Sequence, residues 1–128
     1  MRQYFVLGLL LFAVSVCAAS VTPAFTDVSK PVVIKSSHPH FQIIIKSNPT
    51  TGYKWFLKQY DRNLIKPLGY KYYPPKKAMP GAGGYEIWNF KVKRHGFAVP
   101  QVTKIALIYA RPWEMKSGTS QVFTIFIR

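Results

Sequence analysis

Apolar side chains in this chain recur at every second position, which is the spacing of β-strands and not of α-helices. The pattern is clearest in residues 41–46, 53–58 and 87–93, where large apolar side chains alternate with more polar neighbours. Successive side chains of a strand point to opposite faces of a sheet, so this period predicts strands that bury one face. No stretch of ten residues has the 3.6-residue period of an amphipathic helix. We therefore expect an all-β protein.

Loops rich in glycine or proline separate the alternating runs and set the expected architecture. They lie at residues 47–52, 74–84, 94–100 and 111–120. Strands at this spacing are typical of an antiparallel sandwich or barrel. A chain of 128 residues fits one such domain. We expect about seven strands, near residues 32–35, 41–46, 53–58, 70–73, 87–93, 105–110 and 123–127.

The N-terminal residues have the order of a secretory signal peptide. Arg2 gives a cationic start, residues 4–16 are apolar except for Ser15, and small residues precede Ser20. The apolar run is shorter than the roughly 20 residues needed to span a bilayer. We expect residues 1–19 to be a signal peptide, residues 20–31 a lead-in segment and residues 32–128 the domain, exported to the periplasm or secreted. A membrane anchor, a buried helix or a lipid anchor on Cys17 are the alternatives.

The charge of the chain is strongly positive. Lys and Arg number 18 against 4 Asp and Glu, a formal charge of +14. Without Arg2 of the signal segment the balance is 17 − 4, or +13. Most lysines alternate with apolar residues along the strands, so a solvated outer face with weak attraction to anionic surfaces is expected. A basic, aromatic-rich β-domain also suits single-stranded nucleic acid or an envelope glycan. The signal segment argues against a nucleic-acid partner.

Groups that could support catalysis or hold a metal are few. The four carboxylates are isolated in sequence, and the only cysteine, Cys17, lies in the signal segment. His38 and His40 flank a proline and form a weak metal-binding pattern, but no third ligand accompanies them, which favours exposed loop histidines. Residues 81–84 are glycine-rich, but they do not open a helix as a nucleotide-binding loop would. We expect no cofactor, no metal and no enzymatic activity.

Three loops instead carry features that suit protein recognition. In residues 48–53, Pro49 restricts the residue before it and Gly52 is available for a positive φ, so the turn is rigid. Residues 80–84 lack side-chain bulk, so this segment either flexes or allows the close approach of another backbone. The third loop places Arg111 and Trp113 beside a proline, and Arg and Trp are the residues that most often dominate protein interfaces.

In this order, the three loops resemble those of the chagasin-type inhibitors of papain-like cysteine peptidases. The resemblance spans about residues 32–128 and implies an immunoglobulin-like antiparallel β-sandwich of seven to eight strands with the three loops at one end. It also implies reversible, occlusive inhibition. We separately expect a monomer, although the sequence does not determine the oligomeric state. The first loop would cover the catalytic cysteine and histidine of the peptidase, with Thr50 and Thr51 nearest to them. The sequence does not identify the target peptidase.

The resemblance implies a peptidase-binding role for each residue of the three motifs. Asn48 and Gly52 would fix the first loop, residues 81–84 would approach the peptidase backbone on one flank, and Arg111 and Trp113 would pack on the other. The implied peptidase-binding residues are Asn48, Pro49, Thr50, Thr51, Gly52, Tyr53, Gly81, Ala82, Gly83, Gly84, Arg111, Pro112 and Trp113.

Overall fold

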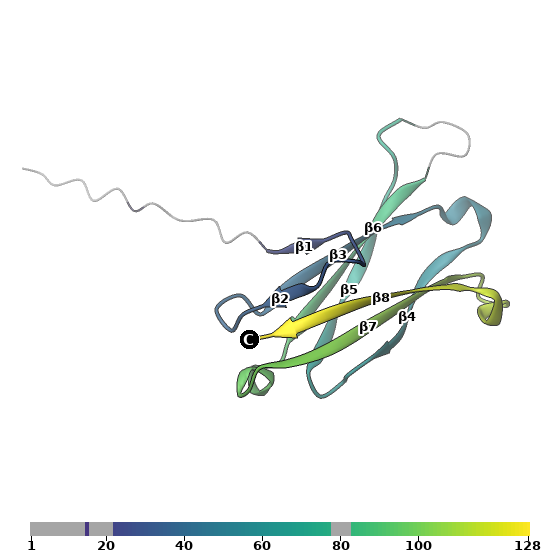
Figure 1. The fold of residues 1–128 in the computed structure, drawn as a ribbon. Helices are drawn as coiled ribbons and strands as arrows, with labels where there is room; N and C mark the ends of the chain where they lie inside the picture. The colour runs from purple at the N-terminus through teal and green to yellow at the C-terminus, as the bar shows by residue number, and fades with distance from the viewer. Residues whose placement is uncertain (1–14, 16–21, 78–82) are drawn as a thin grey trace, which may run out of the picture.

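In the part of the chain that the structure describes, eight strands form two four-stranded sheets that pack face to face as a β-sandwich (Figure 1). The computed structural model describes Ser15 and residues 22–77 and 83–128. Sheet A has the strand order β1–β3–β6–β5, and sheet B has the order β2–β8–β7–β4. The strands are β1 (Ala24–Phe25), β2 (Val32–Ile34), β3 (His40–Ser47), β4 (Lys54–Tyr60), β5 (Ile65–Tyr73), β6 (Gly84–Val92), β7 (Gln101–Ala110) and β8 (Thr119–Ile127).

The prediction of an all-β sandwich is confirmed, and each of the seven expected strands is present. An eighth strand, β1, lies within the segment expected as a lead-in. Two edges differ from the expected antiparallel pairing, because β1 pairs in parallel with β3 and β2 pairs in parallel with β8. The chain crosses from sheet A to sheet B between β1 and β2 and returns for β3. Neither short strand is therefore joined to its partner by a hairpin, which would impose antiparallel pairing.

The alternating pattern of the sequence becomes the core of the sandwich. Phe41 of β3 stacks on Phe90 of β6, with ring centroids 5.5 Å apart, and both side chains are buried. Sheet B contributes inward-facing residues at the same two-residue spacing. A core of this kind stabilises the sandwich by removing apolar surface from water. Its buried members are Val32, Ile34, Phe41, Ile43, Ile45, Trp55, Ile65, Trp88, Phe90, Val92, Ile105, Leu107, Phe123, Ile125 and Ile127.

Several strands begin earlier than the sequence pattern predicts, among them β6 at Gly84 and β8 at Thr119. Strand β5 begins at Ile65, five residues before the expected start, because Pro67 and Gly69 interrupt the alternation there. The pairing with β6 shifts register between these two residues, and Gly69 takes a φ of +114°. A proline and a bulge are tolerated in β5 because it forms the edge of sheet A. Strand β7 likewise begins at Gln101.

Three connections lie at the end of the sandwich away from the C-terminus (Figure 1). We name them L1 (residues 48–53, between β3 and β4), L2 (residues 74–83, between β5 and β6) and L3 (residues 111–118, between β7 and β8). L1 contains the short 3-10 helix η1 (Pro49–Thr51) and L3 contains η3 (Met115–Ser117), whereas η2 (Arg94–Phe97) lies at the opposite end. In the described part of the chain, no helix has the length and apolar character needed to cross a membrane.

Strand register brings the three loops together. Ser47, the last residue of β3, pairs with Gly84, the first residue of β6, so the start of L1 lies beside the end of L2. Lys54, the first residue of β4, pairs with Ala110, the last residue of β7, so the end of L1 lies beside the start of L3. L1 passes from sheet A to sheet B, and it therefore occupies the centre of the three-loop end.

Candidate functional site

L1 is a tight turn closed by its own hydrogen bonds. The N–H of Gly52 donates to the carbonyl of Pro49 at 3.1 Å, and the hydroxyl of Thr51 donates to the carbonyl of Asn48 at 3.0 Å. Gly52 takes a φ of +80°, in the left-handed region that glycine adopts at no steric cost. The rigid turn expected from the sequence is therefore present, and Gly52 ends it.

Tyr109 holds L1 from the side of sheet B. Its hydroxyl accepts a hydrogen bond from the N–H of Asn48 at 3.1 Å and donates to the Asn48 carbonyl at 3.2 Å. Its ring stacks on Tyr53 at 5.2 Å between centroids and lies 4.9 Å from the ring of Trp55. Sequence reasoning missed this residue as part of the site. The alternation of β7 places Tyr109 on the same face as Leu107, but it does not show that the hydroxyl reaches L1.

Arg111 ties L3 to L1. Its Nε donates to the carbonyl of Thr51 at 3.4 Å, and its guanidinium carbon lies 4.8 Å from the centre of the Tyr53 ring. Glu114 of the same loop lies 3.7 Å from the Arg111 guanidinium. A guanidinium over an aromatic face is attracted by the ring electrons. Arg111 is therefore a link between two loops as well as a candidate contact residue.

Trp113 projects from L3 and is the most exposed large hydrophobic side chain of the described residues, at 71%. Part of its ring faces L1, since a Cβ added at Gly52 would lie 3.5 Å from Trp113 Cη2. A large aromatic side chain left in water at the end of a rigid scaffold is a feature of interaction sites. The structure places this tryptophan in an exposed position of L3, and its contact with a peptidase stays a prediction.

The described end of L2 packs against L1. A Cβ added at Gly83 would lie 3.1 Å from the carbonyl oxygen of Ser47 and 3.2 Å from the Cβ of Asn48. Gly84 opens β6 in direct contact with the backbone of Tyr73, where any side chain would clash. Close backbone approach, one of the two alternatives that the sequence left open, is present at these two glycines within the chain. Their approach to a peptidase stays a prediction. Gly81 and Ala82 lie outside the described residues.

The described parts of the three loops therefore form one surface at the end of the sandwich. The predicted contact residues that the structure describes all lie in it: Asn48, Pro49, Thr50, Thr51, Gly52, Tyr53, Gly83, Gly84, Arg111, Pro112 and Trp113. Among the described residues, no group of three or more His, Cys, Asp or Glu is placed to hold a metal ion. His38 and His40 are both exposed, and His38 Nδ1 lies 3.0 Å from the hydroxyl of Ser37.

Comparison with known proteins gives the family. Residues 36–127 match the family described as "Chagasin family peptidase inhibitor I42". The chain belongs to the chagasin family. It is 33% identical over 91 residues to chagasin of Trypanosoma cruzi, an alignment that covers 68% of this chain and 78% of that protein. The family consists of peptidase inhibitors and not of enzymes, so the expectation of a non-catalytic protein is confirmed.

Solved structures show the same fold as this chagasin-family chain. The crystal structure of the cysteine protease inhibitor EhICP2 from Entamoeba histolytica superposes with a TM-score of 0.61, 22% identity and coverage of 84% of this chain and 95% of that one. The solution structure of amebosin gives a TM-score of 0.59 at 22% identity, covering 84% and 97%. The expected immunoglobulin-like sandwich of the chagasin family is therefore confirmed.

Proposed function

We propose that this protein is a reversible, occlusive inhibitor of papain-like cysteine peptidases. Membership of the chagasin family supports inhibition of a peptidase. The crystal structure of a cysteine protease inhibitor with the same fold supports the class of target. In the proposed complex, L1 enters the active-site cleft, and L2 and L3 contact its two flanks. Thr50 and Thr51 lie nearest the catalytic cysteine and histidine.

The proposal rests mainly on one observation, which is that side chains of β7 and L3 hold L1 near its start and near its end. Tyr109 holds Asn48 at the start of the loop, and Arg111 holds Thr51 near its end. A loop that is already ordered loses little conformational entropy on binding, which is how rigid inhibitors gain affinity. Because L1 is a closed 3-10 turn and not an extended segment, we expect it to block the cleft without being cleaved. An interface of about 1,600 Å² in total is typical of such complexes.

The test is a titration of papain with the purified protein, followed by analysis of the recovered inhibitor. We expect stoichiometric inhibition, recovery of peptidase activity on dilution and an intact inhibitor chain. Failure to inhibit papain and other papain-like peptidases, by a folded sample, would contradict the proposal.

Trp113→Ala tests the assignment of the flanking contact. We expect the inhibition constant for papain to rise about 30-fold, since truncation of an interface hot spot costs about 2 kcal/mol. The matched control is Val99→Ala, because Val99 is 60% exposed and follows η2 at the opposite end of the sandwich. Equal inhibition by the Trp113 variant and the control, at unchanged thermal stability, would remove Trp113 from the interface.

We also propose that the protein acts after export. Apart from Ser15, the expected signal peptide, residues 1–19, lies outside the described residues, and the proposal is supported by the sequence pattern alone. N-terminal sequencing of the protein recovered from producing cells tests it. A mature chain that begins at Ser20 supports export, and a chain that retains Met1 contradicts it.

A further inference from the structure

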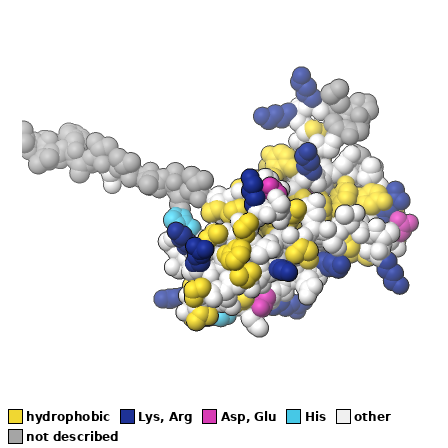
Figure 2. Space-filling model, in the orientation of Figure 1, with side chains coloured by type: hydrophobic (Ala, Val, Ile, Leu, Met, Phe, Trp, Pro, Cys, Tyr) yellow, Lys and Arg dark blue, Asp and Glu magenta, His cyan; other side chains and the backbone are white. Residues whose placement is uncertain are grey.

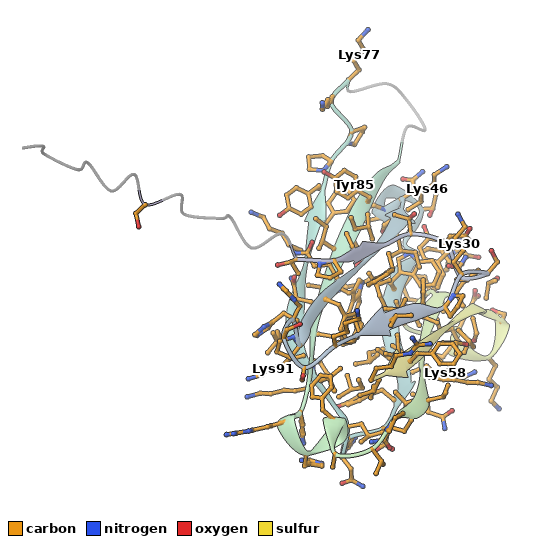
Figure 3. The ribbon with its side chains drawn as sticks, turned by 60° about the vertical axis from the view of Figure 1, so that its left-hand side comes forward. Lys30, Lys46, Lys58, Lys77, Tyr85 and Lys91 are labelled. Atoms are coloured by element: carbon orange, nitrogen blue, oxygen red, sulfur yellow. The ribbon has the colours of Figure 1, made fainter. Side chains whose placement is uncertain are left out.

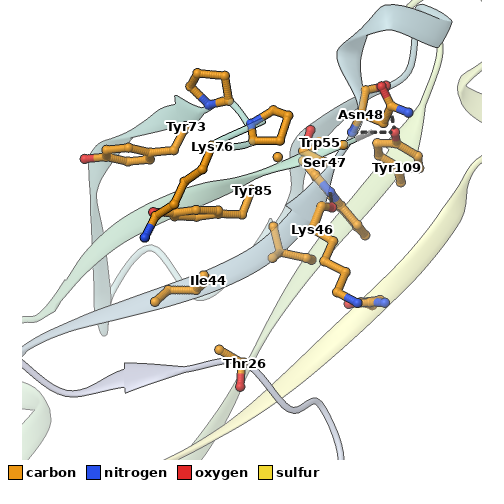
Figure 4. Close-up of a pocket in the computed structure, with 16 residues that line it drawn as sticks. Thr26, Ile44, Lys46, Ser47, Asn48, Trp55, Tyr73, Lys76, Tyr85 and Tyr109 are labelled. Carbon is orange, nitrogen blue, oxygen red and sulfur yellow. Dashed lines mark hydrogen bonds between the residues drawn. The ribbon is translucent and has the colours of Figure 1, made fainter. Parts of the chain in front are cut away.

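A broad groove of about 1130 Å³ adjoins the three-loop end (Figure 4). Ile44, Tyr73 and Tyr85, on the outer face of sheet A, form one side of it. The groove continues to Asn48 of L1 and Gly83 of L2, which also line it. A molecule that covers Asn48 and Gly83 therefore also lies over this end of the groove.

The charges of the groove are all positive. Lys46 and Lys76 line it and are exposed, and none of its described lining residues is acidic. Lys71 adds a third cation close by, with its Nζ 5.3 Å from the centre of the Tyr73 ring. Figure 3 shows Lys46, Tyr85 and Lys77 toward the same end of the molecule, with Lys91 lower, toward the opposite end of sheet A. Figure 2 shows blue side chains at several places on this face of the molecule, with few acidic side chains on this view.

Aromatic and proline side chains give the groove an apolar wall. The rings of Tyr73 and Tyr85 stack with centroids 5.2 Å apart and planes 10° apart, and Tyr85 is 41% exposed. Pro74 and Pro75 continue this wall into L2. Exposed aromatic surface flanked by cations suits a protein partner that presents both apolar atoms and carboxylates.

We propose that this basic groove is a second contact for the target peptidase and that it binds an acidic surface beside the active-site cleft, on the flank contacted by L2. The inference rests on the proposed function and adds a preference among targets. Papain-like peptidases with carboxylates on that flank are bound faster and more tightly than those without. Opposite charges across an interface mainly raise the association rate, and salt weakens the effect.

The experiment compares unmodified papain with papain whose lysines have been succinylated. Succinylation replaces the positive charge of each lysine by a negative charge and keeps the same peptidase. The active-site thiol is protected during modification, and both forms are calibrated by active-site titration. Association and dissociation rates are measured between 20 and 300 mM NaCl. We expect Lys46→Glu/Lys76→Glu to slow association with succinylated papain at least tenfold at low salt, and the difference from the unaltered protein to shrink at high salt.

The matched control is Lys66→Glu/Lys91→Glu. These two lysines face each other across β5 and β6 and lie on sheet A toward its opposite end. Both double variants change the net charge by the same amount, so a general loss of attraction affects them equally. We expect the control to associate at least threefold faster than the groove variant. Tyr85→Ala tests the apolar wall of the groove without changing the net charge. We expect this variant to dissociate from succinylated papain faster than the unaltered protein.

Each outcome decides a separate point. Equal slowing of the two double variants, or slowing of neither, would overturn the groove while inhibition by the unaltered protein remained intact. Failure of the unaltered protein to inhibit either form of papain would instead overturn the proposed function. Retention of single-stranded DNA that depends on Lys46 and Lys76, with both papain forms unaffected, would overturn the proposal in favour of a polyanionic ligand.

Discussion

Tyr109 shows how a side chain outside the three loop motifs can hold one of them, L1, in a single conformation. Its hydroxyl bonds both backbone groups of Asn48, at 3.1 and 3.2 Å, while its ring stacks on Tyr53. Tyr109→Phe removes the hydroxyl and keeps the ring. We expect the free energy of unfolding to fall by about 1 kcal/mol, as for a lost hydrogen bond, and dissociation from papain to accelerate several-fold. Denaturant unfolding and binding kinetics measure the two effects. An unchanged dissociation rate would show that L1 does not need this support.

A substitution at Gly52 tests whether inhibition depends on the backbone conformation of the same loop. Gly52→Ala places a Cβ at a φ of +80°, which costs about 1–2 kcal/mol for a residue other than glycine, and 3.5 Å from the ring of Trp113. We expect at least a tenfold rise in the inhibition constant for papain. Gly69→Ala is the control, because Gly69 has a φ of +114° with nothing within 4 Å of an added Cβ. The two variants are expected to lose similar stability, measured by thermal unfolding, and only the first to lose inhibition.

At the residue scale, the loop motifs could be predicted from the sequence better than the side chains that hold the loops in place. Pro49 and Gly52 restrict the backbone locally, so their effect can be read without the fold. Tyr109 acts across 61 positions of sequence, and no local pattern reveals which loop its hydroxyl reaches. Glu86 was also not foreseen as a core residue. It is 2% exposed, and its Oε1 has no hydrogen-bond partner among the described residues.

At the scale of elements, strand register determines which loops meet. The pairs Ser47–Gly84 and Lys54–Ala110 join L1 to L2 and L3, but neither pair can be derived from alternation alone. Alternation identifies the face of each strand, whereas register depends on contacts between strands that are distant in sequence. The same limit explains the parallel pairing of β1 and β2. The sequence thus predicted the strands and the loop cluster, the latter through the family resemblance.

Strand β5 has features that protect an exposed sheet edge. Pro67 lacks a backbone N–H, the bulge between Pro67 and Gly69 interrupts the ladder, and Lys66 places a charge on the strand. We expect Lys66→Val/Pro67→Val to self-associate as its concentration rises, because the edge becomes a regular, apolar template. Size-exclusion chromatography with light scattering measures the mass. Lys104→Val on the central strand β7 removes the same charge away from an edge and should remain monomeric. A monomeric double variant would show that these residues do not protect the edge.

At the scale of the whole molecule, the positive charge has two effects of opposite sign. The chain has 18 basic and 4 acidic residues, so its cations repel one another in the folded state. In the described part of the chain, the pair Arg111–Glu114 is the one contact within 4 Å between oppositely charged side chains. Repulsion therefore lowers stability with little compensation from ion pairs. The same cations attract an acidic partner.

Salt separates these two effects. Raising NaCl from 10 to 300 mM shortens the screening length from about 30 Å to below about 8 Å. We expect the thermal midpoint to rise by several degrees, as a gain of about 1 kcal/mol would produce in a domain of this size. Over the same range, association with succinylated papain should slow. Lys66→Glu/Lys91→Glu, which relieves part of the repulsion, should show a smaller rise in midpoint, measured by calorimetry. A midpoint that is flat or falls with salt would mean that self-repulsion does not limit stability, and the positive charge would then act only on association.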